Sequence, residues 1–265
     1  MELIAKISKG SKMDQVYIPK NRFGLSTGSY VIIRPIGAGS VSEKPYFYNI
    51  KSIEPIKLEV IAKIFQIIDR YLADYKNIIV AGSFLEKGFN FNDLDLVIIA
   101  KGKHDLTKIK SLIEKNFGIK PHFIMIDNKT LKIGLETDPL YQLMLSKCIS
   151  KKRIIYNYKN QFNYKLLDLH LLKSKVLISN FDILNGNEKY YLTRNTAAIK
   201  LYLKNKKLTK ETVDNEIRNI FNLRDVNDIK ENKISKQDFI KQYKLLYDET
   251  LNIILEGIKN ESKPE

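Results

Sequence analysis

The chain has 265 residues and a formal net charge of +15, an excess that concentrates polyphosphates and other anionic partners around a protein. Its single cysteine, Cys148, excludes an intramolecular disulfide framework and a cysteine-based zinc site, as expected in a reducing cytoplasm. No apolar run approaches the roughly 18 residues of a membrane span, so we expect a cytoplasmic protein with no membrane partner.

Residues 1–40 are predicted to form a small β unit, because short apolar and polar runs alternate there between glycine-containing turns. The segment contains "VYIPKNRFGLSTGSYVIIRPI". It resembles the AbrB-like swapped-hairpin family of DNA-binding regulators, whose pattern is a strand, an Ile-Pro-Lys, a short helical turn and a second strand. The matching residues are Ile18, Pro19, Lys20, Leu25, Gly28, Tyr30 and Val31.

This resemblance implies a homodimer formed through the N-terminal unit and contacts with duplex DNA, for which Lys20 and Arg22 are the candidate residues. The sequence departs from the family in length, because only Asn21 and Arg22 separate "IPK" from "FGL", where the family fits a further helical turn. A unit of this size is too small to bury a core alone. The alternative to pairing with a second copy is a β extension packed on its own chain.

An α/β domain is predicted over residues 55–150, after a linker at 37–47 that is rich in glycine and serine. The domain begins with a helix in "EPIKLEVIAKIFQIIDRYLADY", where apolar residues recur at helical spacing. Two apolar strands follow, then a helix at 105–116 that ends at Gly118, and a strand in "KPHFIMID". The order helix, strand, strand, helix, strand predicts a mixed sheet with helices.

The segment 78–98, "IIVAGSFLEKGFNFNDLDLVI", places two aspartates at the start of an apolar strand. Residues at i and i+2 of a strand point to one face, so Asp93 and Asp95 set two carboxylates side by side. Adjacent anions repel, and a hard divalent cation such as Mg²⁺ or Mn²⁺ between them best explains the pair. Gly82 and Ser83 end the preceding strand, where a backbone N–H and a hydroxyl can approach a phosphate. Metal and phosphate would then meet at one nucleotide.

Gly82, Ser83, Gly88, Asp93 and Asp95, followed by "LVIIA", resemble the signature of the polymerase β-like nucleotidyltransferases. The resemblance covers roughly residues 55–135. It implies that Gly82 and Ser83 hold a nucleoside triphosphate, and that Asp93 and Asp95 bind Mg²⁺ and act in catalysis. A nucleotidyl group would pass to a hydroxyl while pyrophosphate leaves. The alternative interpretation is a tight turn with a polar strand entry.

The third metal ligand of such a site is where the sequence departs from this second family. In-line displacement is best served by two metal ions, and holding both generally takes a third carboxylate from a neighbouring strand. His122 stands at that position, and imidazole is a poorer Mg²⁺ ligand than a carboxylate. Asp127 is the other candidate ligand, although its side chain has the opposite parity on a strand. The departure leaves open whether the chain is an enzyme.

Residues 160–260 are predicted to form a helical domain that completes the substrate cleft, since long helical patterns dominate there. His170 lies on an apolar stripe of this region and is interpreted as a partnered core or boundary residue. The preceding segment 147–160, "KCISKKRIIYNYKN", interleaves cations with tyrosines, which suits nucleic acid. Its candidate contacts are Lys151, Lys152 and Arg153. A solvated, lysine-rich surface is the alternative.

Two functions are consistent with these patterns. The first is a Mg²⁺-dependent nucleotidyltransferase that acts on a hydroxyl of a protein, a nucleic acid or a small molecule. The second is a DNA-binding regulator whose nucleotidyltransferase-like domain senses nucleotide with little or no turnover. The identity of residue 122 and the pairing of the N-terminal unit are the features that discriminate between them.

Overall fold

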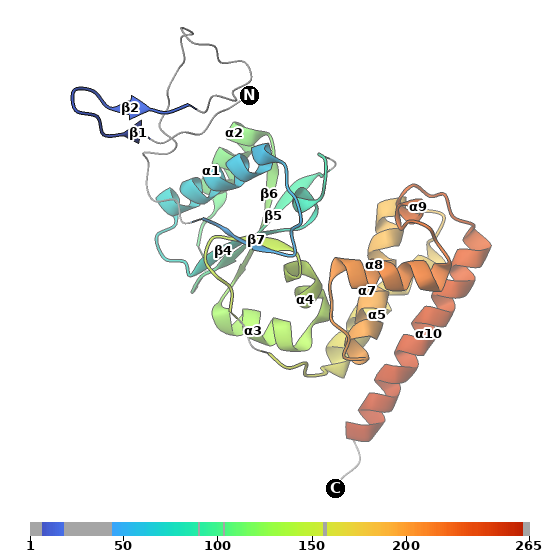
Figure 1. The fold of residues 1–265 in the computed structure, drawn as a ribbon. Coiled ribbons are helices and arrows are strands. Elements are labelled where there is room, and N and C mark those ends of the chain that lie inside the picture. The colour runs from blue at the N-terminus through green and yellow to red at the C-terminus, as the bar shows by residue number, and fades with distance from the viewer. Residues whose placement is uncertain (1–6, 19–43, 90, 103, 156–157, 262–265) are drawn as a thin grey trace. The chain divides into compact units, whose positions relative to one another are not determined.

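The computed structural model describes residues 7–18, 44–89, 91–102, 104–155 and 158–261 (Figure 1). The chain divides into two compact units, Met1–Ser42 and Glu43–Glu265. In the first unit, strands β1 (Ile7–Ser8) and β2 (Gln15–Val16) pair antiparallel.

This pairing accounts for the first half of the β unit that the sequence predicts. The second half of the predicted hairpin, with Lys20 and Arg22, lies outside the described residues. Homodimer formation and DNA contact through this unit therefore stay predictions.

The second unit is built on a five-stranded mixed sheet with the strand order β3-β7-β4-β5-β6. Strands β5 and β6 run parallel to each other, whereas the other neighbouring strands are antiparallel. The strands are β3 (Tyr46–Tyr48), β4 (Asn77–Ala81), β5 (Asp93–Ile99), β6 (Lys120–Ile126) and β7 (Cys148–Ser150). The predicted mixed sheet is thus confirmed.

Helices cover both faces of this sheet. They are α1 (Pro55–Tyr71), α2 (Thr107–Phe117), α3 (Asn128–Thr137) and α4 (Pro139–Leu145), with a 3₁₀ turn, η1 (Ser83–Leu85), after β4. Leu94, Leu96 and Ile98 of β5 belong to the core layer under α1 and α2. Val97 and Ile99 belong to the opposite layer, with α3. Figure 1 shows the pairs α1, α2 and α3, α4 on opposite sides of the sheet.

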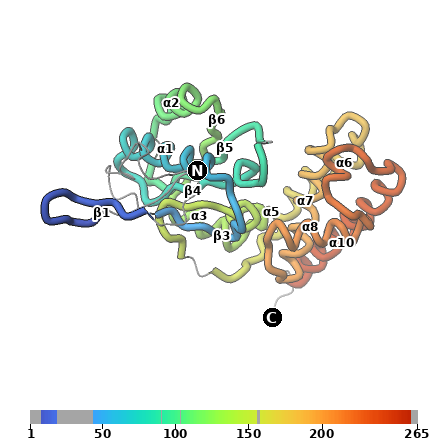
Figure 2. Tube along the Cα trace, turned by 45° about the horizontal axis from the view of Figure 1, so that its top comes forward, coloured from blue at the N-terminus to red at the C-terminus, as the bar shows by residue number. Residues whose placement is uncertain are grey.

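A helical region follows the sheet, as the sequence predicts. Its helices are α5 (Tyr164–Ser174), α6 (Val176–Ser179), α7 (Gly186–Leu203), α8 (Lys210–Phe221), α9 (Asn227–Lys230) and α10 (Lys236–Glu261). Figures 1 and 2 show α5, α8 and α10 beside α7, whose C-terminal half is buried on all sides. Among the described residues, no helix is both long and apolar enough to cross a membrane.

Polar contacts join the helical region to the sheet through α3 and α4. The Tyr202 hydroxyl of α7 donates to the carbonyl oxygen of Glu136, at 2.5 Å. His170 Nε2 of α5 lies 3.1 Å from Asp138 Oδ2, and Asp138 also accepts the backbone N–H of Leu140 to cap α4. The prediction that His170 is a partnered boundary residue is confirmed.

Two parts of the sheet unit differ from the prediction. Residues 46 and 47, assigned to the linker at 37–47, belong to edge strand β3. They pair with β7, a strand of three fully buried residues that the sequence analysis had assigned to a basic segment. A strand this short carries no periodicity of its own, so its neighbours define it. The sequence analysis also assigned no element to the segment that forms α3 and α4.

Candidate functional site

The two aspartates of β5 lie where the sequence places them, at the start of the strand and on one face. Asp93 and Asp95 are half-buried, whereas Leu94 and Leu96 are fully buried on the other face. The carboxylates share the parity of Val97, so they lie on the face that α3 covers further along the strand. Two anions are therefore held side by side and partly in contact with solvent.

Gly82 brings the end of β4 directly against this pair. Ala81 pairs with Asp95 across the antiparallel β4–β5 ladder, and Gly82 follows with φ 80° and ψ −162°. This combination of angles is essentially restricted to glycine. A Cβ at Gly82 would lie 2.1 Å from Asp95 Oδ2, so a side chain at this position would collide with the carboxylate. The glycine is required by both its backbone conformation and its close contact.

Ser83 opens the 3₁₀ turn η1 and is exposed, as is Gly82. Its carbonyl oxygen accepts the backbone N–H of Glu86, which closes the turn at 2.9 Å. The N–H groups of Leu85 and Glu86 are thus bonded within the turn, and the exposed Ser83 directly follows Gly82, which lies against Asp95. A phosphate at this corner would meet the Gly-Ser backbone and the serine hydroxyl together.

His122 is the neighbour of Asp95 on β6. The parallel register sets the two residues side by side, and His122 Nδ1 lies 3.0 Å from Asp95 Oδ1. The histidine side chain is 61% exposed, so it remains accessible to a ligand. The predicted position of His122 beside the aspartate pair is confirmed, and its role as a metal ligand stays a prediction.

Asp127 lies at the other end of the sheet, which corrects its assignment as a candidate metal ligand. The β5–β6 register runs from Asp93 opposite Lys120 to Ile99 opposite Ile126, and Asp127 follows. Its Oδ1 accepts the backbone N–H of Thr130 and caps α3, at 2.7 Å. This hydrogen bond lowers the pKa of Asp127, as a helix-capping carboxylate requires.

The carboxylate pair suits Mg²⁺, although it is not a complete protein cage. Among the described residues, no group of three or more histidine, cysteine, aspartate and glutamate side chains is placed to hold a metal. Mg²⁺ is commonly bound through one or two carboxylates together with substrate phosphates and water. Asp93 and Asp95 therefore fit an ion that arrives with a nucleoside triphosphate.

A buried lysine that the sequence analysis missed donates hydrogen bonds to the loop between Ser83 and Asp93. Lys57 of α1 is 1% exposed, and its Nζ donates to the carbonyl oxygens of Glu86 and Gly88, each at 2.5 Å. Glu54 pairs with the same Nζ at 3.1 Å. The only available signal was a lysine at an otherwise apolar position of the helix.

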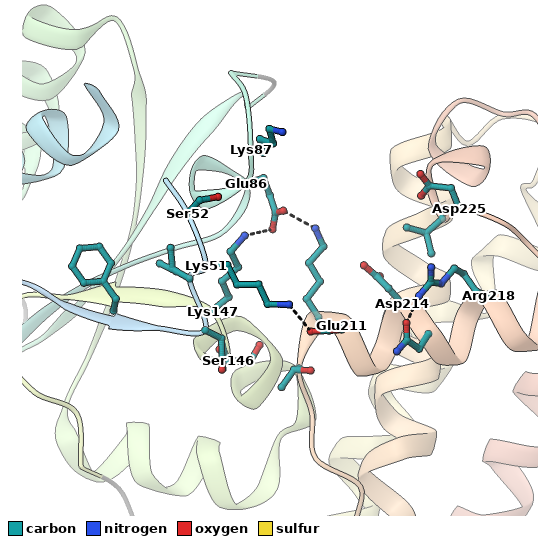
Figure 3. A pocket seen from close by; sticks show the side chains of 17 residues that line it. Lys51, Ser52, Glu86, Lys87, Ser146, Lys147, Glu211, Asp214, Arg218 and Asp225 are labelled. Atoms are coloured by element: carbon teal, nitrogen blue, oxygen red, sulfur yellow. Dashed lines mark hydrogen bonds and ion pairs between the residues drawn. The ribbon is translucent and has the colours of Figure 1, made fainter. Parts of the chain in front are cut away.

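A cleft of about 630 Å³ lies between the sheet and α8, next to this loop (Figure 3). Glu86 reaches into it and pairs with Lys147 at 3.3 Å and with Lys210 of α8 at 2.8 Å. Burial alone would raise the pKa of Glu86, but the two ion pairs outweigh it and lower that pKa overall. Lys51 and Glu211 form a second ion pair across the cleft, at 3.5 Å. Ion pairs therefore connect the helical region to the loop between Ser83 and Asp93.

The cleft also contains a carboxyl group with a raised pKa. Burial raises the pKa of Asp214 on α8, whose Oδ1 accepts the Tyr190 hydroxyl at 2.6 Å. Neither Asp93 nor Asp95 lines the cleft, although Glu86 and Lys87 of the loop between Ser83 and Asp93 do. The cleft is therefore a neighbour of the carboxylate pair and not the same site.

The basic segment is not placed at the carboxylate pair. Lys151 donates to Ile78 O at 2.9 Å, near the end of β4 opposite to Gly82, and its Nζ pairs with Asp69 and with Tyr75 Oη. Lys151 is thus occupied by internal partners. Lys152 and Arg153 are exposed, and their contact with nucleic acid stays a prediction.

Comparison with protein-family models and with curated protein sequences gives no match to this chain.

Proposed function

We propose that this chain is a Mg²⁺-dependent, nucleotidyltransferase-like protein that transfers a nucleotidyl group from a nucleoside triphosphate to a hydroxyl acceptor. The observation that carries the proposal is the contact of Gly82 with Asp95. A glycine-only conformation at the end of one strand lies against one of two carboxylates at the start of the next. A tight turn alone would account for the glycine, but it gives no reason for two adjacent carboxylates or an exposed serine.

Each residue of this corner has a role in the proposal. Asp93 and Asp95 would hold Mg²⁺, which would supply positive charge to offset that of the phosphates. The Gly82–Ser83 backbone and the Ser83 hydroxyl would orient the triphosphate. The acceptor oxygen forms a bond to the α-phosphorus, the bond from that phosphorus to the oxygen bridging the α- and β-phosphates breaks, and the hydroxyl proton passes to water. The acceptor is a hydroxyl of a protein, a nucleic acid or a small molecule.

A second candidate, a nucleotide-sensing DNA-binding regulator, is favoured by one observation. His122 occupies the position next to Asp95 where a third carboxylate would help to hold a second metal ion. With one metal, the site would bind a triphosphate and turn it over slowly or not at all. The N-terminal unit would then contact DNA.

Label transfer from radiolabelled triphosphates to a mixed pool of RNA and protein acceptors separates the two candidates. We expect transfer and pyrophosphate release by the wild type with Mg²⁺, and their loss in Asp93→Asn. His122→Asp should raise turnover roughly tenfold, since about 1.4 kcal/mol off the barrier is one decade in rate. Asp127→Asn should leave turnover unchanged. If the wild type and His122→Asp both bind triphosphate but transfer no label, the nucleotidyltransferase proposal fails and the nucleotide-sensing regulator takes its place.

A further inference from the structure

Lys57 is a fully buried ammonium group in the first turns of α1. An ammonium taken out of water is tolerated only when its hydrogen-bonding capacity is met. The Nζ of Lys57 donates to Glu86 O and Gly88 O, each at 2.5 Å, and forms an ion pair with Glu54 Oε2 at 3.1 Å. Two of the three partners are backbone atoms of a loop distant in sequence from α1.

Glu54 holds the same loop from a second direction. Its Oε1 accepts the backbone N–H of Gly88 at 2.6 Å, so Gly88 is bound through both its N–H and its C=O. The hydrogen bond from Gly88 and the pairing with Lys57 hold the pKa of Glu54 at about 2, so the carboxylate is charged at neutral pH. Gly88 has φ 83°, the left-handed backbone in which glycine is favoured.

Three aromatic rings complete the surroundings of Lys57. Its Nζ lies 5.7 Å from the ring centre of Phe84, 5.3 Å from that of Phe89 and 5.6 Å from that of Phe91. Cations within about 6 Å of an aromatic face are attracted to it. One ammonium group therefore interacts with aromatic rings at both ends of the segment from Phe84 to Phe91.

This segment joins the two halves of the proposed site. It begins directly after Gly82 and Ser83 and ends two residues before Asp93, with the turn η1 as its regular element. The position of the phosphate-binding corner relative to the metal-binding carboxylates therefore depends on how the loop is held. Sites of this kind lose function when supporting residues let the geometry shift by about 1 Å.

We propose that Lys57, with Glu54, is a positioning residue that fixes the Gly82–Ser83 corner relative to Asp93 and Asp95 and thereby sets the affinity for a metal-bound triphosphate. The inference rests on the proposed function for the identity of the ligand. It does not give Lys57 any contact with substrate.

Lys57→Met is the direct test, and Lys200→Met is its matched control. Lys200 is 7% exposed, and its Nζ pairs with Glu216 at 3.1 Å and Glu249 at 2.9 Å, within the helical region. Both changes remove a buried ammonium and its ion pairs, although Glu249 keeps Lys204 and Glu54 keeps the N–H of Gly88, so both should lower the melting temperature. Hydrogen–deuterium exchange and titration with Mg²⁺ and nucleoside triphosphates are then measured below the melting temperature of each variant.

We expect Lys57→Met to raise exchange across residues 82–93 and to weaken triphosphate binding by roughly tenfold or more, while Lys200→Met changes neither. Equal affinity in Lys57→Met and wild type, or an equal loss in Lys200→Met, would overturn the positioning role. If Lys57→Met does not fold, Glu54→Gln serves instead, and unchanged exchange and affinity in that variant would overturn it. Absence of triphosphate binding by the wild type would overturn the proposed function and, with it, the ligand of this inference.

Discussion

The two ends of the central sheet both carry buried or half-buried polar groups, but they use them differently. At one end, Asn77 is 6% exposed, and its Oδ1 accepts the backbone N–H groups of Ile78 and Lys152, at 2.9 and 2.8 Å. Its Nδ2 donates to Lys152 O at 3.0 Å. At the other end, Asp93 and Asp95 lie side by side and half-buried, with His122 beside Asp95.

This difference separates a polar group that holds the fold from one that is available to a ligand. The Asn77 amide has partners at both its nitrogen and its oxygen and is 6% exposed, so it stabilises the junction of β4 with the chain after β7. The aspartates are like charges that are partly open to water, and His122 is a neighbour of Asp95 alone, so a bound cation would lower their repulsion. Variants at the two ends should accordingly fail in different assays.

The largest effect is expected for Asp93→Asn combined with Asp95→Asn. Removing both charges should weaken triphosphate binding in Mg²⁺ by roughly 100-fold or more. The melting temperature should stay level or rise slightly, because a like-charge repulsion is removed. Equilibrium dialysis and thermal unfolding measure the two quantities. Unfolding of the double variant would show that the carboxylates are structural.

Gly82→Ala should be the next most damaging change at this end. The alanine must leave a glycine-only conformation, and its Cβ must displace the Asp95 carboxylate. We expect destabilisation of about 1–3 kcal/mol from backbone strain alone, together with loss of triphosphate binding. Gly118→Ala is the matched control, since Gly118 has φ 65° and open space at its Cβ position. If Gly118→Ala lost as much triphosphate binding as Gly82→Ala, the contact of Gly82 with Asp95 would not explain the loss.

At the opposite end, Asn77→Ala should affect stability and not binding. The change leaves the backbone N–H of Lys152 without its partner in a part-buried site, which costs about 1–3 kcal/mol, whereas the C=O of Lys152 keeps the Ser150 hydroxyl. Triphosphate affinity, measured at a temperature where the variant is folded, should equal that of the wild type. Chemical denaturation gives the first quantity and dialysis the second. A selective loss of affinity would remove the distinction between the two ends.

The smallest effect is a pH dependence from Glu54, whose pKa of about 2 lies below its ordinary value. A carboxylate with a lowered folded-state pKa contributes stability above its unfolded pKa and loses it as the pH falls. We expect the wild type to lose stability between about pH 5 and pH 2, and Glu54→Gln to show a shallower decline. Thermal unfolding across this range measures both slopes. Parallel slopes would contradict the assignment.

Sequence patterns were enough to predict the sheet layer and the corner of the site. The apolar runs before Gly82 and after Asp95 indicate buried strands, and two aspartates at i and i+2 of a strand share one face. The family resemblance also placed His122 at the third-ligand position, and the register sets it beside Asp95. These features depend on residues that are close in sequence or on adjacent strands.

The missed features depend on contacts that no local pattern contains. Strand β7 has three residues and is defined by its neighbours β3 and β4. Lys57 resembles an ordinary helix residue until the loop containing Gly88 folds over it. Asp127 was a reasonable ligand by composition, and only the β6 register shows that it lies at the wrong end of the sheet. Long-range packing decided each of these cases.

Titration of wild-type protein with nucleoside triphosphates, once in Mg²⁺ and once in EDTA, tests most directly whether the carboxylate end of the sheet is a metal and nucleotide site. Isothermal calorimetry reports affinity and stoichiometry together. We predict saturable binding of one triphosphate per chain in Mg²⁺ or Mn²⁺, and none in EDTA, because Asp93 and Asp95 repel a triphosphate that arrives without its metal. Equal affinity in Mg²⁺ and EDTA, or no binding in either, would contradict this assignment.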